Sequence, residues 1–357
     1  MKPQFDVFRN APVFITGHTG FKGSWLASWL HLLGADVTGY SLPPKRPEDH
    51  FNALRLESRV RHIEGDILDA GHLARAVSEA RPEFVFHLAA QPLVRRSYLE
   101  PRLTFETNVL GSVNLMEALR GSESTRVLIF VTSDKCYKDQ SGNWGYRETD
   151  PLGGRDPYSA SKACAELVFS CYQASYFATQ GLRSGSVRAG NVIGGGDWAE
   201  DRIVPDSIRA LSSGQNICLR QPRTVRPWQH VLEPLSGYLT LASELAGDKG
   251  SALTGEAWNY GPAAGSHRTV EELAQAVVSR WGDGKVVVSE ALDTHLKESA
   301  MLYLNCDKTQ HRTGWRPQWD FERSIETTVD WYRCFLGGAD SWRLTTSQIA
   351  AYSEVHK

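Results

Sequence analysis

Residues 13–23 are Val-Phe-Ile-Thr-Gly-His-Thr-Gly-Phe-Lys-Gly, and this stretch decides the fold. Its first three residues are apolar and predict a short buried strand. Glycines follow at positions 17, 20 and 23, and large apolar residues then recur at helical spacing from Phe21 to Leu33. A strand, a glycine-rich turn and a helix in this order are typical of a phosphate-binding turn, because the backbone must approach the pyrophosphate closely and the helix N-terminus offers free N–H groups. We therefore expect a dinucleotide to bind at Gly17, His18, Thr19, Gly20, Phe21, Lys22 and Gly23.

Length and composition restrict the class of protein. The 357 residues include 39 Lys plus Arg and 41 Asp plus Glu, so net charge predicts no nucleic-acid-binding surface. The six cysteines include no CxxC pair and no zinc spacing, so we expect no metal site and reduced thiols in a cytoplasmic protein. The first residues lack the apolar core of a signal peptide, and no apolar run approaches the roughly 18 residues of a membrane span. We expect a soluble globular protein without membrane contact.

Strand and helix patterns alternate through the first half of the chain. Apolar segments near residues 37–40, 61–67, 84–87 and 127–131 predict strands, with helical spacing between them. This alternation predicts an α/β fold with a doubly wound parallel sheet and right-handed crossovers. The alternation ends after residue 189, so we expect a first domain over 1–189 and a smaller second domain over 190–357. Residues 227–260 are expected to return to the first domain.

The glycine spacing is G-x-x-G-x-x-G, and it resembles the extended short-chain dehydrogenase/reductase superfamily, whose members often act on nucleotide-linked sugars. The resemblance implies a Rossmann-like first domain that binds NAD and a C-terminal domain that binds a sugar nucleotide. The acidic residue that normally follows the second strand and binds the ribose 2′-hydroxyl is absent. Lys45 or Arg46 could instead neutralise a 2′-phosphate, so NADP stays open. His18 and Lys22 are also unusual in this turn, where they either touch phosphate or lie on its rim.

The resemblance implies further cofactor contacts beyond the glycine turn. Asp66 stands where the superfamily contacts the adenine, and the small residues Ala89 and Ala90 would let a cofactor lie against the backbone. Ordinary packing accounts for each of these positions equally well. The expected contacts are Asp66, Ile67, Leu88, Ala89, Ala90 and Asn108, together with Tyr158 and Lys162.

Tyr158 and Lys162 begin a helix that follows Asp156-Pro157. Their spacing of four places both side chains on one helical face. An ammonium group near a phenol favours the phenolate, so we expect a lowered Tyr158 pKa and a base for a sugar hydroxyl. Such a pair is common by chance. Together with the glycine turn and Thr132-Ser133, it matches the catalytic arrangement of the superfamily.

The segment Thr132-Ser133-Asp134-Lys135 follows the apolar run 127–131. It therefore emerges at the carboxyl end of a strand, where ligands bind in parallel α/β sheets. A dehydrogenase or a 4-epimerase needs only a Thr132 or Ser133 hydroxyl with Tyr158 and Lys162. A sugar-nucleotide 4,6-dehydratase also needs an acid to expel the C6 hydroxyl and a base to remove the C5 proton. Asp134 and Lys135 supply these two groups.

Asp-Lys in place of the Asp-Glu of several dehydratases resembles the dehydratases that act on CDP-glucose. The resemblance extends over nearly the whole chain, through residues 91–95, 188–198 and 226–231. Lys135 as the base would have to be neutral, and a pKa near 7 instead of about 10.4 requires roughly 4–5 kcal/mol of bias from its surroundings. The alternative is a protonated Lys135 that stabilises the enolate beside the C4 ketone.

Arginines in the second half are candidates for the pyrophosphate of the sugar nucleotide, because a guanidinium offers a planar fork of donors. A surface position accounts equally well for Arg220 or Arg223, whereas the setting of Arg226 in Arg-Pro-Trp-Gln-His-Val favours function. The expected substrate contacts are Gln91, Arg95, Asn191, Arg202, Arg220, Arg226 and His230.

The resemblance implies conversion of CDP-D-glucose to CDP-4-keto-6-deoxy-D-glucose and water, within deoxysugar biosynthesis for a surface polysaccharide such as the lipopolysaccharide O-antigen. It also implies a homo-oligomer, a dimer or possibly a tetramer. A UDP-sugar 4,6-dehydratase and a 4-epimerase are alternatives. A dinucleotide-binding sensor or scaffold is a third, but it would not need Asp134, Lys135, Tyr158 and Lys162 together.

Overall fold

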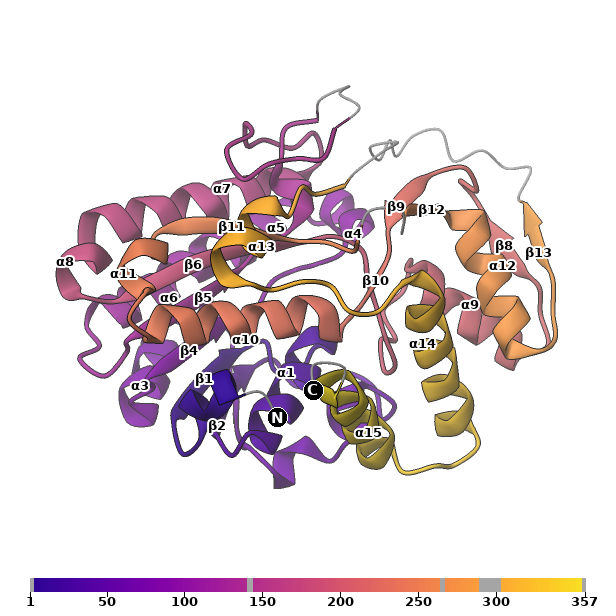
Figure 1. Ribbon diagram of the computed structural model, residues 1–357, viewed down its shortest axis with the longest axis horizontal. Helices are drawn as coiled ribbons and strands as arrows, with labels where there is room; N and C mark the ends of the chain where they lie inside the picture. The colour runs from indigo at the N-terminus through magenta and orange to yellow at the C-terminus, as the bar shows by residue number, and fades with distance from the viewer. Residues whose placement is uncertain (1–2, 140–143, 264–266, 289–302, 355–357) are drawn as a thin grey trace.

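The computed structural model describes residues 3–139, 144–263, 267–288 and 303–354. Its central sheet has seven strands in the order β11-β6-β5-β4-β1-β2-β3, and every neighbouring pair is parallel (Figure 1). The strands are β1 (Pro12–Thr16), β2 (Asp36–Ser41), β3 (Arg61–Glu64), β4 (Phe84–His87), β5 (Val127–Val131), β6 (Arg183–Ala189) and β11 (Glu256–Tyr260). The strand order reverses between β1 and β4, which opens a crevice beyond their carboxyl ends. The predicted parallel, doubly wound sheet is confirmed.

Alternating side chains of the strands separate two apolar cores. Val13 and Ile15 belong to one core, whereas Phe14 between them belongs to the other. Helices α1 (Phe21–Leu32) and α10 (Leu232–Ala246) cover the first face, and α3 (Ala70–Ala80), α6 (Gly111–Arg120) and α7 (Pro157–Tyr172) contribute to the core of the second. Both faces are therefore buried, as a parallel sheet requires.

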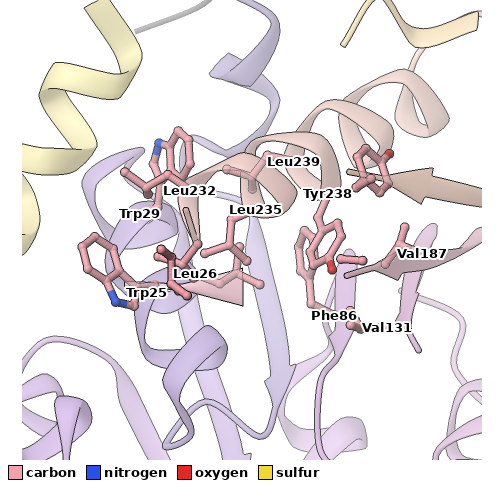
Figure 2. Close-up of a cluster of buried hydrophobic side chains, with 14 of the residues drawn as sticks. Trp25, Leu26, Trp29, Phe86, Val131, Val187, Leu232, Leu235, Tyr238 and Leu239 are labelled. Carbon is pink, nitrogen blue, oxygen red and sulfur yellow. The ribbon is translucent and has the colours of Figure 1, made fainter. Parts of the chain in front are cut away.

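Helix α10 brings the second half of the chain back onto the sheet. Figure 2 shows its apolar side chains beside those of α1, with Tyr238 lying against the strands. The labelled residues are Trp25, Leu26, Trp29, Phe86, Val131, Val187, Leu232, Leu235, Tyr238 and Leu239. Each fully buried leucine contributes about 1.5–3 kcal/mol relative to an exposed one. This packing fixes the loops around α10 against the carboxyl ends of the strands.

A smaller group of elements lies beyond the carboxyl end of the sheet (Figure 1). Strand β8 (Ile217–Leu219) pairs with β13 (Val286–Val288), and β9 (Val225–Pro227) pairs with β12 (His267–Thr269). Helices α9 (Ile203–Ser212), α12 (Val270–Trp281) and α14 (Phe321–Leu336) pack beside them. We call these elements the small lobe. Strands β7 (Val192–Ile193) and β10 (Gln229–His230) pair in the connection between the lobe and the sheet.

Several short elements lie near the crevice. The loop after β4 leads into α4 (Val94–Leu99), α5 (Pro101–Phe105) and a π-helical turn η3 (Glu106–Leu110), and β5 ends in a 3₁₀ turn η4 (Asp134–Cys136).

The remaining elements are η1 (Pro3–Phe8), α2 (His50–Ala53), η2 (Leu56–Ser58), η5 (Gln173–Phe177), α8 (Ala178–Gln180), α11 (Gly250–Leu253), α13 (Asp307–Thr313) and α15 (Ser341–Glu354). Within the described ranges, no helix is both long enough and apolar enough to cross a bilayer.

Candidate active site

A cavity of about 920 Å³ occupies the crevice beyond the carboxyl ends of the strands. Its lining runs from the glycine turn past the ends of β4 and β5 to β8 and β9 of the small lobe. That volume lies at the upper end of the range typical of ligand pockets. The central sheet and the small lobe therefore share one continuous cavity, and each of them supplies part of its wall.

The glycine turn fits a phosphate group. Gly17 has a φ of +79°, and a Cβ added there would lie 2.6 Å from the backbone nitrogen of Ala89. A Cβ on Gly23 would lie 2.1 Å from the carbonyl oxygen of Gly17. Helix α1 begins at Phe21, so its unpaired N–H groups and positive dipole end border the cavity. The chain thus needs glycine at both positions, and the turn offers backbone donors to a dinucleotide pyrophosphate.

His18 and Lys22 occupy different environments. Lys22 lines the cavity, and burial followed by the charge of Arg202 lowers its pKa to about 8. His18 lies beneath the turn, fully buried, with its Nε2 2.7 Å from Nδ1 of His62. Burial and then His62 lower the His18 pKa to about 3. The His18 ring packs against Gly39 of β2, where a Cβ would lie 2.2 Å from it, and His18 is not part of the cavity lining, so its contact with phosphate stays a prediction.

The residues after β2 form the rim where the expected acid is absent. Ser41 and Leu42 line the cavity, and the Thr19 hydroxyl lies 2.8 Å from that of Ser41 and donates to the carbonyl of Leu42. Lys45 also borders the cavity. Arg46 instead donates to the carbonyl of Trp198 and to the carboxylate of Glu200. Of the two basic residues proposed for a 2′-phosphate, only Lys45 lines the cavity within the described chain.

Five of the residues that we expect to contact the cofactor from the strand ends form part of the cavity wall. The cavity is lined by Asp66, Ile67, Leu88, Ala89 and Ala90. Asn108 does not line it. Its side chain is buried in η3, where it accepts from the N–H of Gln91 at 2.8 Å and donates to the hydroxyl of Ser161 at 2.9 Å. Asn108 therefore links the loop after β4 to α7, and its direct contact with the cofactor stays a prediction.

Tyr158 and Lys162 both line the cavity from the first two turns of α7. The helix begins there because Asp156 caps it, accepting from the N–H of Ser159 at 2.9 Å, and Pro157 occupies its first turn. Burial raises the pKa of Tyr158 to about 12, and its hydrogen bond with Ser133 lowers it only in part. Burial also lowers the Lys162 pKa to about 8, against the charge of Glu166. The expected lowering of the Tyr158 pKa is therefore reversed by desolvation in this structure.

The choice between Thr132 and Ser133, which the sequence leaves open, follows from their hydrogen bonds. Thr132 donates its hydroxyl hydrogen to the carboxylate of Glu166. Ser133 bonds with Tyr158 and lies 3.0 Å from Oδ1 of Asp134. Both residues line the cavity. Ser133 is thus the hydroxyl that reaches the Tyr158 phenol, whereas Thr132 supports the strand end.

Asp134 and Lys135 line the cavity from turn η4, directly after Ser133. The Ser133 side chain caps this turn by accepting from the N–H of Lys135 at 3.2 Å. Asp134 is buried, and burial raises its pKa while Lys135 and the Ser133 hydrogen bond lower it. Its Oδ2 makes no hydrogen bond within the described chain. A carboxyl whose pKa is raised, with one oxygen unbonded beside the cavity, suits the donation of a proton.

Six of the seven substrate contacts expected from the sequence line the cavity. The cavity is lined by Gln91, Arg95, Asn191, Arg202, Arg220 and Arg226. His230 is an exception, because its fully buried ring lies between Trp25 and Trp319 in the core and does not line the cavity. Arg223 is exposed and does not line the cavity.

Ion pairs connect the arginines at the cavity entrance. Asp201 pairs with Arg220 at 3.0 Å and with Arg95 at 3.6 Å, so one carboxylate joins α4 to the segment after β8. Asp201 has a φ of +59°, which is uncommon for a residue other than glycine. Arg202 pairs with Asp197 at 2.7 Å. We call Arg95, Asp201 and Arg220 the cavity mouth.

Sequence reasoning missed two parts of the site. The apolar wall formed by Ile217, Leu219 and Val270 was missed because β8 is a strand of three residues with no motif. The buried pair Glu166–Arg188 was missed because its members lie 22 residues apart, on a helix and a strand. A Glu one turn after Lys162 on the same helix face was the available signal.

The family model described as GDP-mannose 4,6 dehydratase matches residues 14–328. The chain belongs to this family. It is 43% identical over 345 residues to the CDP-glucose 4,6-dehydratase of Salmonella typhimurium, and the match covers 95% of each chain. Two solved structures resemble this fold over most of their length. The UDP-glucose 4-epimerase of Thermus thermophilus in complex with NAD has a TM-score of 0.75 at 28% identity, covering 90% of this chain and 98% of that one.

The second is a double mutant of a dTDP-glucose 4,6-dehydratase from Streptomyces venezuelae with NAD bound. Its TM-score is 0.74 at 25% identity, and the match covers 92% of this chain and 99% of that one. The expected membership among sugar-nucleotide dehydratases is thereby confirmed at the level of the family. The relatives include a dehydratase and an epimerase on one fold, so the reaction has to be argued from the side chains of the site.

Proposed function

We propose that this protein is a CDP-glucose 4,6-dehydratase that converts CDP-D-glucose to CDP-4-keto-6-deoxy-D-glucose and water. One observation carries the proposal: Asp134 and Lys135 line the same cavity as Tyr158 and Lys162. A 4-epimerase needs no acid and base beyond the Tyr-Lys pair, whereas a dehydratase does. The relative from Salmonella typhimurium, 43% identical over 95% of the chain, supports CDP-glucose as the substrate.

The cofactor of the proposal is NAD. Gly17, Gly20 and Gly23 would hold its pyrophosphate against the N-terminus of α1, and Asp66 would lie at its adenine end. The two similar structures described above contain NAD. Bound NAD supplies an acceptor for hydride from C4 of the sugar and a donor of hydride to C6, so the reaction consumes no net oxidant.

The side chains of the chain divide the proton transfers among them. Tyr158, hydrogen-bonded to Ser133 and assisted by Lys162, removes the proton from the C4 hydroxyl as the C4 ketone forms. The ketone makes the C5 proton acidic, and Lys135 removes it. Asp134 protonates the departing C6 hydroxyl, which leaves as water. Hydride addition at C6 and reprotonation at C5 complete the product.

The experiment for this proposal compares CDP-, UDP-, dTDP- and GDP-glucose as substrates of the purified protein. We expect a 4-keto-6-deoxy product with the highest kcat/KM for the CDP sugar. The C4 epimer without a keto sugar would contradict dehydration and favour the epimerase. Equal or faster turnover of UDP-glucose would contradict the CDP assignment and favour a UDP-sugar dehydratase. Binding of NAD without turnover of any sugar would favour a dinucleotide sensor.

The two parts of the chain would divide the ligands between them. Residues 1–189 supply the glycine turn and Tyr158–Lys162, and we assign NAD to them, with 227–260 returning to this domain through α10 and β11. Residues 190–357 contribute Asn191, Arg202, Arg220 and Arg226, to which we assign the sugar nucleotide. Hydrogen exchange of the whole protein checks this division, because CDP should protect the small lobe and NAD should protect the glycine turn.

The exposed surface supports a proposal for the assembly of the protein. Large apolar side chains are exposed around α4, α5, η3 and α7, namely Leu99, Leu103, Phe105, Leu110 and Leu167. Such exposure is typical of an interaction surface, and we assign it to a homodimer, which the mass from light scattering tests.

All six cysteines are free, and Cys171, Cys218 and Cys334 are exposed. Exposed free thiols fit the reducing environment of the cytoplasm, to which we assign the protein, and cell fractionation tests this location.

A further inference from the structure

A buried ion pair lies directly beneath the catalytic residues. The side chains of Glu166 and Arg188 are 3% and 4% exposed, and their nearest charged atoms are 2.8 Å apart. The contact is bidentate, because Arg188 Nε also donates to the other carboxylate oxygen at 2.9 Å. Burial alone would raise the pKa of Glu166, but Arg188 together with the hydrogen bonds from Thr132 and Ser186 holds that pKa below its ordinary value. Both partners are therefore ionised, and removing one of them would leave the other as an unpaired buried charge.

Glu166 ties the catalytic helix to two strands. It lies on α7, one turn after Lys162 and two turns after Tyr158. Its carboxylate accepts from the hydroxyl of Thr132 at the end of β5 and from that of Ser186 on β6 at 2.8 Å. With the two Arg188 bonds, four donors converge on one carboxylate. The register of α7 against the sheet is thereby fixed beside the Tyr158–Lys162 face.

Arg188 extends the same network to the turn that carries the acid and the base. Its Nη1 donates to the hydroxyl of Tyr137 at 2.8 Å, and its guanidinium carbon lies 4.8 Å from the centre of the Tyr137 ring. Tyr137 follows η4 directly, and its hydroxyl donates to Asn259 of β11 at 2.7 Å. The network therefore connects to both Asp134–Lys135 and Tyr158–Lys162, although Glu166, Arg188 and Tyr137 do not themselves line the cavity.

We infer that Glu166 and Arg188 are positioning residues, whose ion pair sets the placement of the Tyr158–Lys162 helix face relative to the Asp134–Lys135 turn. This inference rests on the proposed function, because dehydration requires the Tyr158–Lys162 pair and the Asp134–Lys135 pair to act on the same sugar. A misplacement of about 1 Å in such a site costs on the order of 10²-fold in rate. Four charge-assisted hydrogen bonds in a dry site resist that displacement.

Glu166 also acts on Lys162 through its charge. Lys162 faces Glu166 on its own helix, Cys136 of η4, and the His87 and Lys22 side chains, whose pKa values its own charge lowers. Burial leaves His87 and Cys136 neutral at pH 7, so Glu166 is the anion among these groups that opposes the desolvation of Lys162. Lys162 assists Tyr158 while protonated, and that form is lost as pH rises through about 8. Removing the Glu166 charge lowers the Lys162 pKa, so activity is lost at a lower pH.

The test uses Glu166→Gln, which keeps the shape and removes the charge. A matched control is Glu233→Gln, because Glu233 is a fully buried carboxylate of α10 that accepts from the N–H groups of Gln318 and Trp319 and from the hydroxyl of Tyr352. Both variants remove one buried carboxylate, but only Glu166 adjoins the catalytic residues. A second variant, Glu166→Gln with Arg188→Met, removes both charges and avoids an unpaired buried guanidinium.

Each variant is assayed for kcat, KM and the pH dependence of kcat. The substrate is the sugar nucleotide that the wild-type protein turns over best, so the test remains valid even if that substrate is not CDP-glucose. We expect kcat to fall about 10²-fold for Glu166→Gln and for the double variant, while KM stays within about twofold of the wild-type value. In both variants the loss of kcat at alkaline pH should begin at a lower pH than in the wild-type protein. Glu233→Gln should lower the melting temperature without moving this alkaline loss of kcat. An unchanged pH profile in the folded double variant, or an equal shift in Glu233→Gln, would overturn the inference and leave a structural role only.

Discussion

The catalytic residues and the cavity mouth line the same cavity but are held in opposite ways. Asp134, Tyr158 and Lys162 are nearly fully buried on a helix and a strand end. The side chains of Arg95, Asp201 and Arg220 at the mouth are 35–42% exposed and pair across the two lobes. The difference follows from their tasks, because proton transfer needs fixed geometry in a dry site, whereas a charged diphosphate must exchange with solvent.

Exposure also decides how each region responds to substitution. Desolvation moves the pKa of Tyr158 to about 12 and that of Lys162 to about 8, so single changes there alter the chemistry. Exposed ion pairs such as those of Asp201 contribute about 0–1 kcal/mol and are screened by salt. Variants of the buried residues should therefore change kcat, and variants of the mouth should change KM.

The largest effect is expected for Tyr158→Phe. The change removes the phenol that takes the C4 proton and keeps the ring, so kcat should fall by about 10²–10⁴-fold. The affinity for CDP, measured by calorimetry, should stay within about threefold because the mouth is unchanged. A folded variant that keeps more than a tenth of the wild-type kcat would show that the buried region does not hold the C4 base.

Lys135→Ala should separate the two halves of the reaction. If Lys135 is the base, deuterium from solvent should no longer enter C5, and kcat should fall by about 10²–10⁴-fold. Incorporation at C5 is followed by mass spectrometry in D₂O, with Lys45→Ala as a control that removes a lysine from the rim of the same cavity. Retained exchange with lost water elimination would instead assign Lys135 to enolate stabilisation.

The same contrast explains what the sequence could reveal. The glycine turn, Thr132–Lys135 and the pair Tyr158 and Lys162 were predictable because each is a local pattern at a strand end or on one helix face. All of these except His18 line the cavity. The parallel sheet followed from alternating apolar periods, which act along the chain. Local patterns therefore located the chemical groups of the buried region.

Burial and long-range pairing were not predictable from local patterns. His18 and His230 stand inside motifs, yet both rings are enclosed by side chains from distant segments. The Tyr158 pKa rises although Lys162 is four residues away, because desolvation depends on the whole fold. Glu166–Arg188 and the bridging role of Asp201 likewise depend on elements that meet only in the folded chain.

The smallest effect is expected at the mouth, for Asp201→Asn. The Asp201 carboxylate binds Arg95 and Arg220, which we assign to the diphosphate, so it competes with the substrate for the same donors. Asparagine tolerates the φ of +59° at this position, so the backbone should keep its conformation. We expect KM for the sugar nucleotide to fall about two- to fivefold at low salt, with kcat unchanged and the difference shrinking as salt is added. Asp6→Asn removes the partner of a surface pair with Arg9 and serves as the control. A KM that rises would mean that Asp201 orders the two arginines for the substrate, and the mouth would then share the fixed geometry of the catalytic residues.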